Sequence, residues 1–496
     1  MYNSGLQELF GIQLNCRSVN TKLAELKMLL YTKKPHFLAL SETWIKRNEP
    51  KFINYNTEWK HRIDRSGGGL GLLIKRGIQY QTINLNEFSN GVLEVQAIKI
   101  FENNNANNYV TILNLYNPNK NLTINELRHY VSQLGNKYVI TGDLNGHSAF
   151  LDDKVTRPNP TGKTLEYIIL NDEICLANPL NMYTHLNISN YTRSCLDICL
   201  TSRNLIAGTT VSLLEDVGSD HLPLKMVVQI KPAQCEIFHR KKWKINEDNL
   251  IQYKNNIPLS NLVLPSSVDT ILNDITSRIL LSATQNISKT SGKPRQGKKT
   301  PWWDAECSLA LALRRRMKKN LDRSPTMENV HLYQEKSRLL TTLCKKKKKE
   351  SFKQYVGSLD MNTPTALVWK KIRALTGIHT QDIPPLIQGN EILTTSSDKA
   401  NHIAEYFQSI SNESLKNNPD GFEKLLHSTI NAGQNEEYNK PIILQEMITA
   451  LSNVKNTSPG EDEIPYLLIK NLKVENKLEI LYMYNTCLQT SYFPDL

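Results

Sequence analysis

The stretch Lys137-Tyr138-Val139-Ile140-Thr141-Gly142-Asp143-Leu144-Asn145 joins a short apolar run to two polar side chains at its end. Residues 137–141 are too few for a good helix and are rich in β-branched side chains, so they predict a buried strand. A carboxylate beside a buried strand must be hydrogen-bonded, paired or metal-bound. The stretch therefore predicts a core strand that delivers Asp143 and Asn145 to a site.

Further strands and helices alternate on both sides of this stretch. Short runs rich in Val, Ile and Leu predict strands at residues 37–41, 109–115, 195–200 and 224–230. Thr123, with Glu126 three residues later and Gly135 as a stop, predicts one capped helix. Apolar spacing predicts another helix over residues 20–31. We therefore expect an α/β domain over residues 8–232.

The remaining chain has a different composition. Residues 233–300 are polar and predict a linker, most clearly at residues 291–301. Apolar residues recur every four positions from Leu309, which predicts a basic helical connector over residues 301–440. Helical runs flank a Ser458-Pro459-Gly460 turn within residues 441–496. We expect this C-terminal region to be mostly helical.

The net charge of +12 is unevenly distributed. Residues 1–232 hold 24 basic and 20 acidic side chains, residues 233–380 hold 28 and 12, and the remainder hold 8 and 16. An excess of basic residues suits a polyanion, because each neutralised phosphate releases counterions. A solvated helix face is the alternative explanation of a lysine run. The composition favours a nucleic-acid partner.

Eight cysteines are scattered without a Cys-x-x-Cys string or zinc-type spacing. We therefore expect reduced thiols in an intracellular protein, nuclear or cytoplasmic and not secreted. The N-terminal residues lack the features of a secretory signal, and no apolar run approaches the roughly 20 residues that span a bilayer. We expect no membrane partner.

Polar residues interrupt or end several of the predicted strands. They are Glu42, Asp143, Asn145, Asp197, Asp220 and His221. Each alone is compatible with an ordinary solvated turn, but together they predict convergence on one site. Magnesium takes oxygen ligands and leaves positions for a phosphate, and Glu42 is the best single ligand. Asp143 and Asn145 can position water, and Asp197 can orient His221.

The ordered motifs resemble the endonuclease/exonuclease/phosphatase family, and in detail the apurinic-type endonuclease of jockey-like non-LTR retrotransposons. The resemblance covers approximately residues 8–231. Its motifs are Asn15-Cys16-Arg17-Ser18, Leu40-Ser41-Glu42-Thr43-Trp44, Ser66-Gly67-Gly68-Gly69, Tyr116-Asn117-Pro118, Gly142-Asp143-Leu144-Asn145, Ser194-Cys195-Leu196-Asp197 and Ser219-Asp220-His221-Leu222-Pro223.

The resemblance implies a role for each matched residue. It assigns metal binding to Glu42, Asp220 and Asn15. It assigns catalysis to Asp143, Asn145, His221, Asp197 and Tyr116. Asn15, Thr184 and Ser219 would bind substrate, with Tyr116 and Thr184 at the phosphate. Tyr116 as a core aromatic and Thr184 as an ordinary strand residue are the alternatives. The implied cofactor is magnesium, with manganese as a substitute.

Pro301-Trp302-Trp303-Asp304, the run Lys345–Lys349 and Trp369-Lys370-Lys371-Ile372 are similar to the connector of jockey-like elements. Ser458-Pro459-Gly460 resembles the opening of their reverse transcriptase, so we expect a truncated start of that domain over residues 441–496. No Tyr-x-Asp-Asp string occurs, and no polymerase activity is expected.

The resemblance implies a four-layer α/β sandwich of two mixed sheets flanked by helices, followed by the basic helical region. It implies a magnesium-dependent endonuclease that nicks DNA and leaves a 3′ hydroxyl, with element RNA as a second partner of the connector. A phosphomonoesterase or RNA exonuclease of the same fold, and a non-catalytic nucleic-acid-binding relic, are the alternatives.

Overall fold

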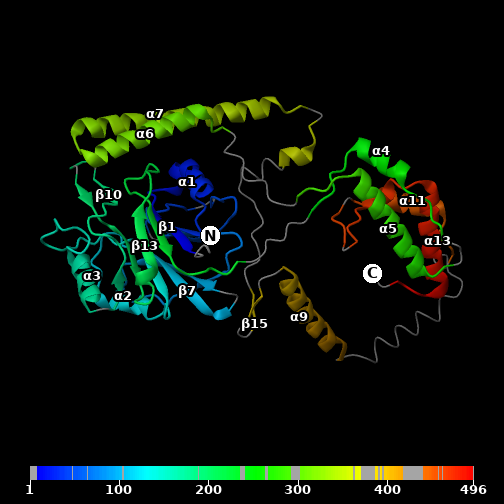
Figure 1. Ribbon diagram of the computed structural model, residues 1–496, viewed down its shortest axis with the longest axis horizontal. Helices are drawn as coiled ribbons and strands as arrows, with labels where there is room; N and C mark the ends of the chain where they lie inside the picture. Colours follow the sequence, from blue (N-terminus) through cyan, green and yellow to red (C-terminus); the bar gives the residue numbers. More distant parts are fainter. Residues whose placement is uncertain are drawn as a thin grey trace, which may run out of the picture. The chain divides into compact units, whose positions relative to one another are not determined.

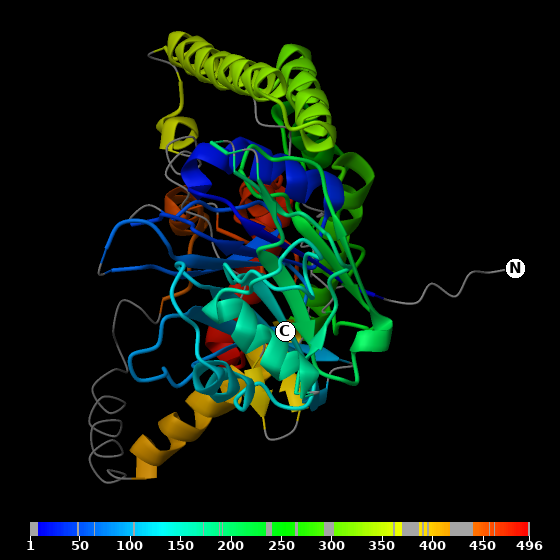
Figure 2. The same ribbon diagram turned by 90° about the vertical axis from the view of Figure 1, so that its left-hand side faces the viewer.

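The computed structural model forms two compact units, residues 1–237 with 296–402 and residues 238–295 with 403–496. Figures 1 and 2 show the ribbon from two sides. The structure describes residues 8–46, 49–63, 65–102, 105–171, 173–187, 189–190, 192–234, 241–262, 266–291, 302–360, 363–369, 386–388, 391–393, 396–416, 440–455, 457–460 and 462–494. Residues 292–301 of the expected linker and 370–372 of the tryptophan motif lie outside them.

A six-stranded mixed sheet forms one central layer of the first unit. Its order is β13 (Thr209–Leu213), β14 (Leu224–Val228), β1 (Leu9–Asn15), β2 (Phe37–Ser41), β4 (Leu70–Lys75) and β3 (Tyr55–Lys60). The β1–β2 pair is parallel and the other pairs are antiparallel. Helix α1 (Val19–Lys33) packs on the outer face, where Leu26, Leu29 and Leu30 cover Ile12 and Leu38.

An eight-stranded sheet forms the second central layer. Its path is β15 (Leu386–Gln388), β16 (Glu391–Leu393), β7 (Asn105–Tyr116), β8 (Tyr138–Asp143), β12 (Asp197–Thr201) and β9 (Cys175–Leu176), with β5 (Tyr80–Ile83) and β6 (Glu94–Glu102) joined through β7. The β7–β8 pair is parallel, so this sheet is also mixed. Helices α2 (Ile124–Val131) and α3 (Pro160–Leu170) cover its outer face.

The inner faces of the two sheets share one apolar core. Leu9, Phe37 and Ala39 of the first sheet pack with Ile98, Val110, Ile112 and Val139 of the second. Helix, sheet, sheet and helix thus form four layers, which confirms the predicted fold class. The Thr123 side chain accepts a hydrogen bond from Glu126 N at 3.2 Å, as its capping motif predicts.

The first unit also contains β10 (His185–Leu186), β11 (Arg193–Ser194), the short 3-10 helix η1 (Ile206–Gly208) and two long helices. α6 (Ala305–Arg323) and α7 (Met327–Gly357) form an antiparallel hairpin beside α1 (Figures 1 and 2). α9 (Ser396–Lys416) follows later in the chain. Helices α6, α7 and α9 confirm the predicted helical character of much of the connector, but its described residues also include the short strands β15 and β16.

The second unit is a helical bundle. It contains α4 (Glu247–Asn256), α5 (Val268–Asn286), α11 (Leu444–Asn453), α12 (Tyr466–Lys470) and α13 (Val474–Thr490). The range 233–300, expected to be a polar linker, therefore holds two helices. Ile271, Ile275 and Ile279 form a buried stripe on α5, and this stripe outweighs the loop preference of the Ser and Asn residues around it. Among described residues, no helix is both long and apolar enough to span a membrane.

Candidate active site

The first half of the site lies where β1 and β2 end. Asn15 faces Ser41 in the parallel register, so Glu42 follows directly beside Asn15. Asn15 Nδ2 donates to Glu42 Oε1 at 2.9 Å, and the Tyr116 hydroxyl donates to the same oxygen at 3.0 Å. Glu42 has a φ of 50°, a left-handed conformation that is costly for a residue with a side chain. Such strain clusters at functional sites.

The second half lies at the end of β8. Asp143 faces Tyr116 across the parallel β7–β8 pair and Asp197 across the antiparallel β8–β12 pair. Gly142 has a φ of 151°, and a Cβ there would lie 1.8 Å from the carbonyl oxygen of Leu115. Only glycine permits this close approach of β8 to β7. Register and glycine together bring the three side chains to one edge.

A single amide joins the two halves across the sandwich. Asn15 Nδ2 also donates to Asp143 Oδ2 at 2.8 Å, so one side chain holds two carboxylates near each other. Asn145 N donates to Asp143 Oδ1 at 3.0 Å, and Asn145 Nδ2 donates to the Asn117 carbonyl at 2.8 Å. The position of Asp143 is therefore fixed from both sheets.

His221 lies beside Asp143 with its ring oriented by Asp197. His221 Nδ1 is 2.7 Å from Asp197 Oδ2, and Nε2 is 3.8 Å from Asp143 Oδ2. Gln13 Nε2 donates to the other Asp197 oxygen at 2.8 Å. Because Nδ1–H donates to Asp197, Nε2 is left facing the site. All four side chains are buried.

The buried charges shift one another's pKa values. Burial lowers the pKa of His221, but the neighbouring carboxylates, led by Asp197, outweigh it and raise that pKa to about 10. Burial raises the pKa of Asp143 to about 7, although His221 opposes this shift. Burial also acts to raise the pKa of Asp197, yet its ion pair with His221 holds that pKa below the ordinary value. Negative charge is thus in excess around Asp143.

Asp220 lies at the more open side of the site. It forms an ion pair with Arg17, and His185 Nε2 is 3.7 Å from Asp220 Oδ2. The rings of His185 and His221 lie 4.6 Å apart between centroids. A cavity of about 470 Å³ opens here, lined by Arg17, Lys22, Trp44, His185, Leu186, Asn187, Ser189, Gly218, Ser219 and Asp220.

The structure brings the predicted strand-end residues to this one edge. Direct contacts link Glu42, Asn15, Asp143, Asn145, Tyr116, His221 and Asp197, and Asp220 adjoins His221 in the chain. Their individual roles in catalysis and metal binding stay predictions.

Two residues predicted to bind substrate contact other residues of the site. Thr184 is 1% exposed, and its hydroxyl accepts from Asp197 N at 3.1 Å. Ser219 is 3% exposed, and its hydroxyl donates to the Asn15 carbonyl at 2.7 Å. Both hydroxyls therefore support neighbouring site residues, and their expected contact with substrate stays a prediction.

Sequence reasoning missed Gln13 and His185. Gln13 is fully buried in a strand that otherwise reads as apolar, two residues from Asn15 and so on the same face. That period-two spacing of polar residues was an available signal. His185 comes directly after Thr184 and begins the two-residue strand β10. Nothing in the local sequence distinguishes it from an ordinary histidine.

Comparison with known proteins agrees with the motifs. Residues 110–225 match the family model described as "Endonuclease-reverse transcriptase". The chain is 20% identical over 97% of its length to the probable RNA-directed DNA polymerase from transposon BS of Drosophila melanogaster, covering 53% of that protein. It is 21% identical over 95% of its length to the RNA-directed DNA polymerase from mobile element jockey of Drosophila funebris, covering 51% of it. The chain spans about half the length of these curated relatives.

Two solved structures similar to the chain are the endonuclease domain of TRAS1, a telomere-specific non-LTR retrotransposon, and the APE2 catalytic domain of Xenopus laevis. The first has 14% identity and a TM-score of 0.38, covering 45% of this chain and 99% of that one. The second has 16% identity and a TM-score of 0.36, covering 46% and 94%. The family match and the curated relatives confirm the resemblance to non-LTR retrotransposon endonucleases.

Proposed function

We propose that this chain, which resembles the endonucleases of non-LTR retrotransposons, hydrolyses a phosphodiester bond of DNA with the help of a magnesium ion. The observation that carries the proposal is the contact chain from Glu42 through Asn15 to Asp143, and from Asp143 through His221 to Asp197. A hydrolase of phosphate esters needs oxygen ligands, a held water and a proton donor at one place. These five side chains offer all three.

In the proposed reaction, a water oxygen adds to phosphorus and the bond from phosphorus to the 3′ oxygen breaks. Asp143 and Asn145 orient the water, and Asp143 accepts its proton. The pKa of Asp143, raised by burial to about 7, suits a group that takes a proton near neutral pH. The departing 3′ oxygen takes a proton from solvent water, and Asp143 later releases its proton to solvent, so the products are a 5′ phosphate and a 3′ hydroxyl.

His221 faces the phosphoryl group in this scheme. Carboxylates around the buried ring raise its pKa to about 10, so it is protonated at neutral pH. Its Nε2–H can donate to a phosphoryl oxygen as negative charge develops there. Asp197 and Gln13 keep the ring in the orientation that this donation requires.

The donor set fits a hard divalent cation. Glu42, Asp220 and Asn15 are the residues that would hold it, and all three offer oxygen atoms. Glu42 is partly exposed, and one of its oxygens is fixed by Asn15 and Tyr116. Burial raises the pKa of Asp143, and a neighbouring cation would favour its charged form. Magnesium would supply charge neutralisation at the phosphate, and manganese accepts similar ligands.

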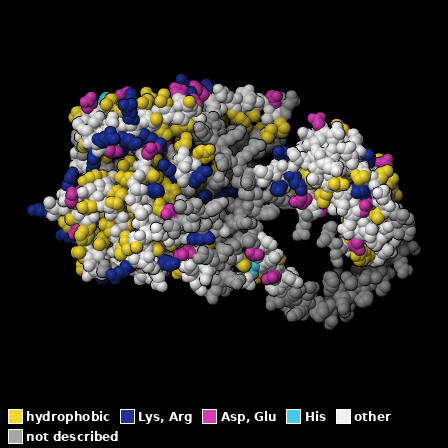
Figure 3. All heavy atoms as spheres, in the orientation of Figure 1, with side chains coloured by type: hydrophobic (Ala, Val, Ile, Leu, Met, Phe, Trp, Pro, Cys, Tyr) yellow, Lys and Arg dark blue, Asp and Glu magenta, His cyan; other side chains and the backbone are white. Residues whose placement is uncertain are grey.

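Charge supports a nucleic-acid substrate. Lys345, Lys346, Lys348 and Lys349 are exposed on α7, and Lys and Arg side chains are visible in dark blue along the α6–α7 hairpin (Figure 3). Exposed basic groups bind phosphates and make affinity salt-dependent. By resemblance the substrate is target DNA, and the connector additionally binds element RNA.

A substrate panel tests the proposal. Purified full-length protein is incubated with supercoiled plasmid, an oligoribonucleotide and an inositol polyphosphate, each with magnesium and with a chelator. We expect nicked plasmid with a 3′ hydroxyl, only with the metal, and loss of nicking in His221→Ala. His129→Ala, a histidine on α2, is the matched control and keeps activity. Turnover of only the other substrates would reassign the reaction, and DNA binding without turnover would favour a relic.

A further inference from the structure

Arg314 of α6 lies buried between two carboxylates of the layered domain. The residue is 3% exposed. Its Nη1 donates to Glu25 Oε1 of α1 at 2.8 Å, and its Nε lies 2.9 Å from Asp216 Oδ2. Asp216 belongs to the loop between β13 and β14, which also carries Ser219, Asp220 and His221. One guanidinium thus ties a helix of the connector to the loop of the candidate active site.

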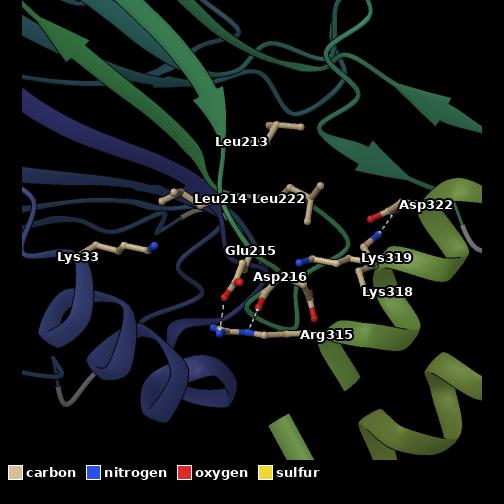
Figure 4. Close-up of a pocket in the computed structure, with 10 residues that line it drawn as sticks. All are labelled: Lys33, Leu213, Leu214, Glu215, Asp216, Leu222, Arg315, Lys318, Lys319 and Asp322. Atoms are coloured by element: carbon tan, nitrogen blue, oxygen red, sulfur yellow. Dashed lines mark hydrogen bonds and ion pairs between the residues drawn. The ribbon is translucent and has the colours of Figure 1, made fainter. Parts of the chain in front are cut away.

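Other side chains of the helix pair reach the same loop. Arg315 Nε donates to the Asp216 carbonyl at 3.2 Å, and Arg315 also pairs with Glu215. Figure 4 shows Arg315 directed at both residues, and all three line a cavity of about 360 Å³. From α7, the Tyr333 hydroxyl lies 3.4 Å from Asp216 Oδ1. Asp216 is therefore held by both helices.

The backbone of the loop packs directly against Arg314. Gly218 has a φ of 82°, and a Cβ at this position would lie 2.8 Å from Arg314 Nη1 and 3.1 Å from Glu25 Oε1. Gly218 N also donates to Asp216 Oδ1 at 2.8 Å. Gly218 stands two residues before Asp220. Displacement of Arg314 would therefore free the backbone immediately before the site residues.

The helix pair also covers the element on the other side of Asp220. Leu186 of β10 packs with Leu321 of α6 and Tyr333 of α7. Arg193 of β11 donates through Nη2 to the Leu321 carbonyl at 3.2 Å. Leu186 N in turn donates to the Asp220 carbonyl at 3.2 Å. The loop is thus held from two directions by one pair of helices.

We propose that the α6–α7 hairpin is part of the nuclease body and that Arg314 is a positioning residue, which fixes the loop bearing Asp220 and His221. This inference rests on the proposed function. Arg314 touches no reacting atom, so it acts through the loop alone. Its removal leaves Glu25 and Asp216 without their shared cation, and the loop must move to rehydrate the buried Asp216. A displacement of about 1 Å at a catalytic group can cost roughly 100-fold in rate.

The first test compares kinetics of full-length variants on supercoiled plasmid with magnesium. Arg314→Met should lower kcat by about 10- to 100-fold and change KM by less than about threefold, because the loop positions groups without supplying the substrate contact. Arg314→Lys should recover part of kcat. Arg128→Met is the matched control, since Arg128 forms a similar pair with Glu173 on the surface of the same unit, and it should leave kcat unchanged.

The second test measures hydrogen exchange in the loop and does not depend on catalysis. Hydrogen–deuterium exchange of peptides over residues 214–222 should rise in Arg314→Met and stay unchanged in Arg128→Met. Tyr333→Phe removes only a hydroxyl and should give a smaller rise in exchange. It replaces Arg314→Met in this test if that variant fails to fold. Unchanged exchange and kcat in the folded variants would overturn the inference. Absence of nicking by the native protein would refute the proposed function, while the exchange comparison would still decide the positioning role.

Discussion

Two buried charge clusters of the first unit are balanced in different ways. Around Asp143, three carboxylates, those of Glu42, Asp143 and Asp197, share one titratable cation, His221. Around Arg314, one permanently charged guanidinium pairs with two carboxylates, those of Glu25 and Asp216. Each cluster combines carboxylates with one nitrogen cation, a histidine in the first and an arginine in the second. With three carboxylates to one cation against two to one, the first cluster has the larger surplus of negative charge.

The difference indicates what each cluster is suited to do. A buried carboxylate that lacks a full counter-charge is costly, and a protein retains such a group where a ligand or a reaction uses it. A buried carboxylate paired with arginine is a structural contact whose loss leaves an uncompensated charge. Neutralising a carboxylate of the catalytic cluster should therefore preserve the stability of the protein but not its activity. The Arg314 cluster should lose stability when it is broken.

The largest effect is expected from a substitution of Asp197 in the catalytic cluster. Asp197→Asn keeps the shape of the side chain but removes the charge that orients His221. Loss of the orienting carboxylate in a comparable histidine pair costs roughly 10⁴-fold, so we expect nicking to fall by about 10³- to 10⁴-fold. Rates on supercoiled plasmid measure this, with circular dichroism as the check on folding. A loss of less than tenfold would exclude the proposed role of Asp197.

The next largest effect is expected from a substitution in the Arg314 cluster. Arg314→Met should lower the free energy of unfolding by about 3–5 kcal/mol, because both carboxylates lose their cation while Asp216 stays buried. Denaturant unfolding followed by circular dichroism measures the change. Arg128→Met removes an exposed arginine from a surface pair and should leave the unfolding midpoint nearly unchanged. Equal destabilisation by the two variants would contradict the comparison.

Metal addition tests whether the catalytic cluster binds a cation in the folded protein. Magnesium or manganese at about 100 times its dissociation constant should stabilise the native protein by about 2.7 kcal/mol, because a ligand that binds only the folded state stabilises it. Glu42→Gln should abolish this gain, and Arg128→Met should keep it. The thermal unfolding midpoint with and without metal measures both. A gain that persists in Glu42→Gln would place the ion elsewhere.

The smallest effect is a pH dependence of stability. Burial raises the folded-state pKa of Asp143 to about 7, so between pH 4 and 7 the metal-free folded state binds more protons than the unfolded state. The contribution of Asp143 to stability therefore falls as pH rises through this window. Asp143→Asn should show a shallower decline than the native protein. Parallel stability curves from pH 4 to 7 would show that Asp143 is not titrating there.

Much of the fold follows from local sequence. The run before Gly142 and the Thr123 cap predict β8 and the start of α2 correctly, because each depends on a few neighbouring residues. The helices within residues 233–300 were missed, since α5 owes its stability to burial against α4 and α13, not to local preference. Packing between distant segments decides such cases.

The site could be predicted in composition but not in detail. Polar residues at strand ends identified Asp143 and His221, since their placement next to core strands is unusual. Gln13 and Thr184 both support Asp197, yet these contacts depend on how two sheets face each other. Arg314 was equally hidden, because nothing in a basic helix distinguishes the one arginine that is buried.

The most direct test of the central claim compares Asp143→Asn with Asp216→Asn in the same two measurements. Asp143→Asn should reduce magnesium-dependent nicking by at least about 100-fold while the metal-free protein is as stable as the native one or more so. Asp216→Asn should instead lower the free energy of unfolding, because it breaks the pair with Arg314. Native-level nicking by folded Asp143→Asn would contradict the account.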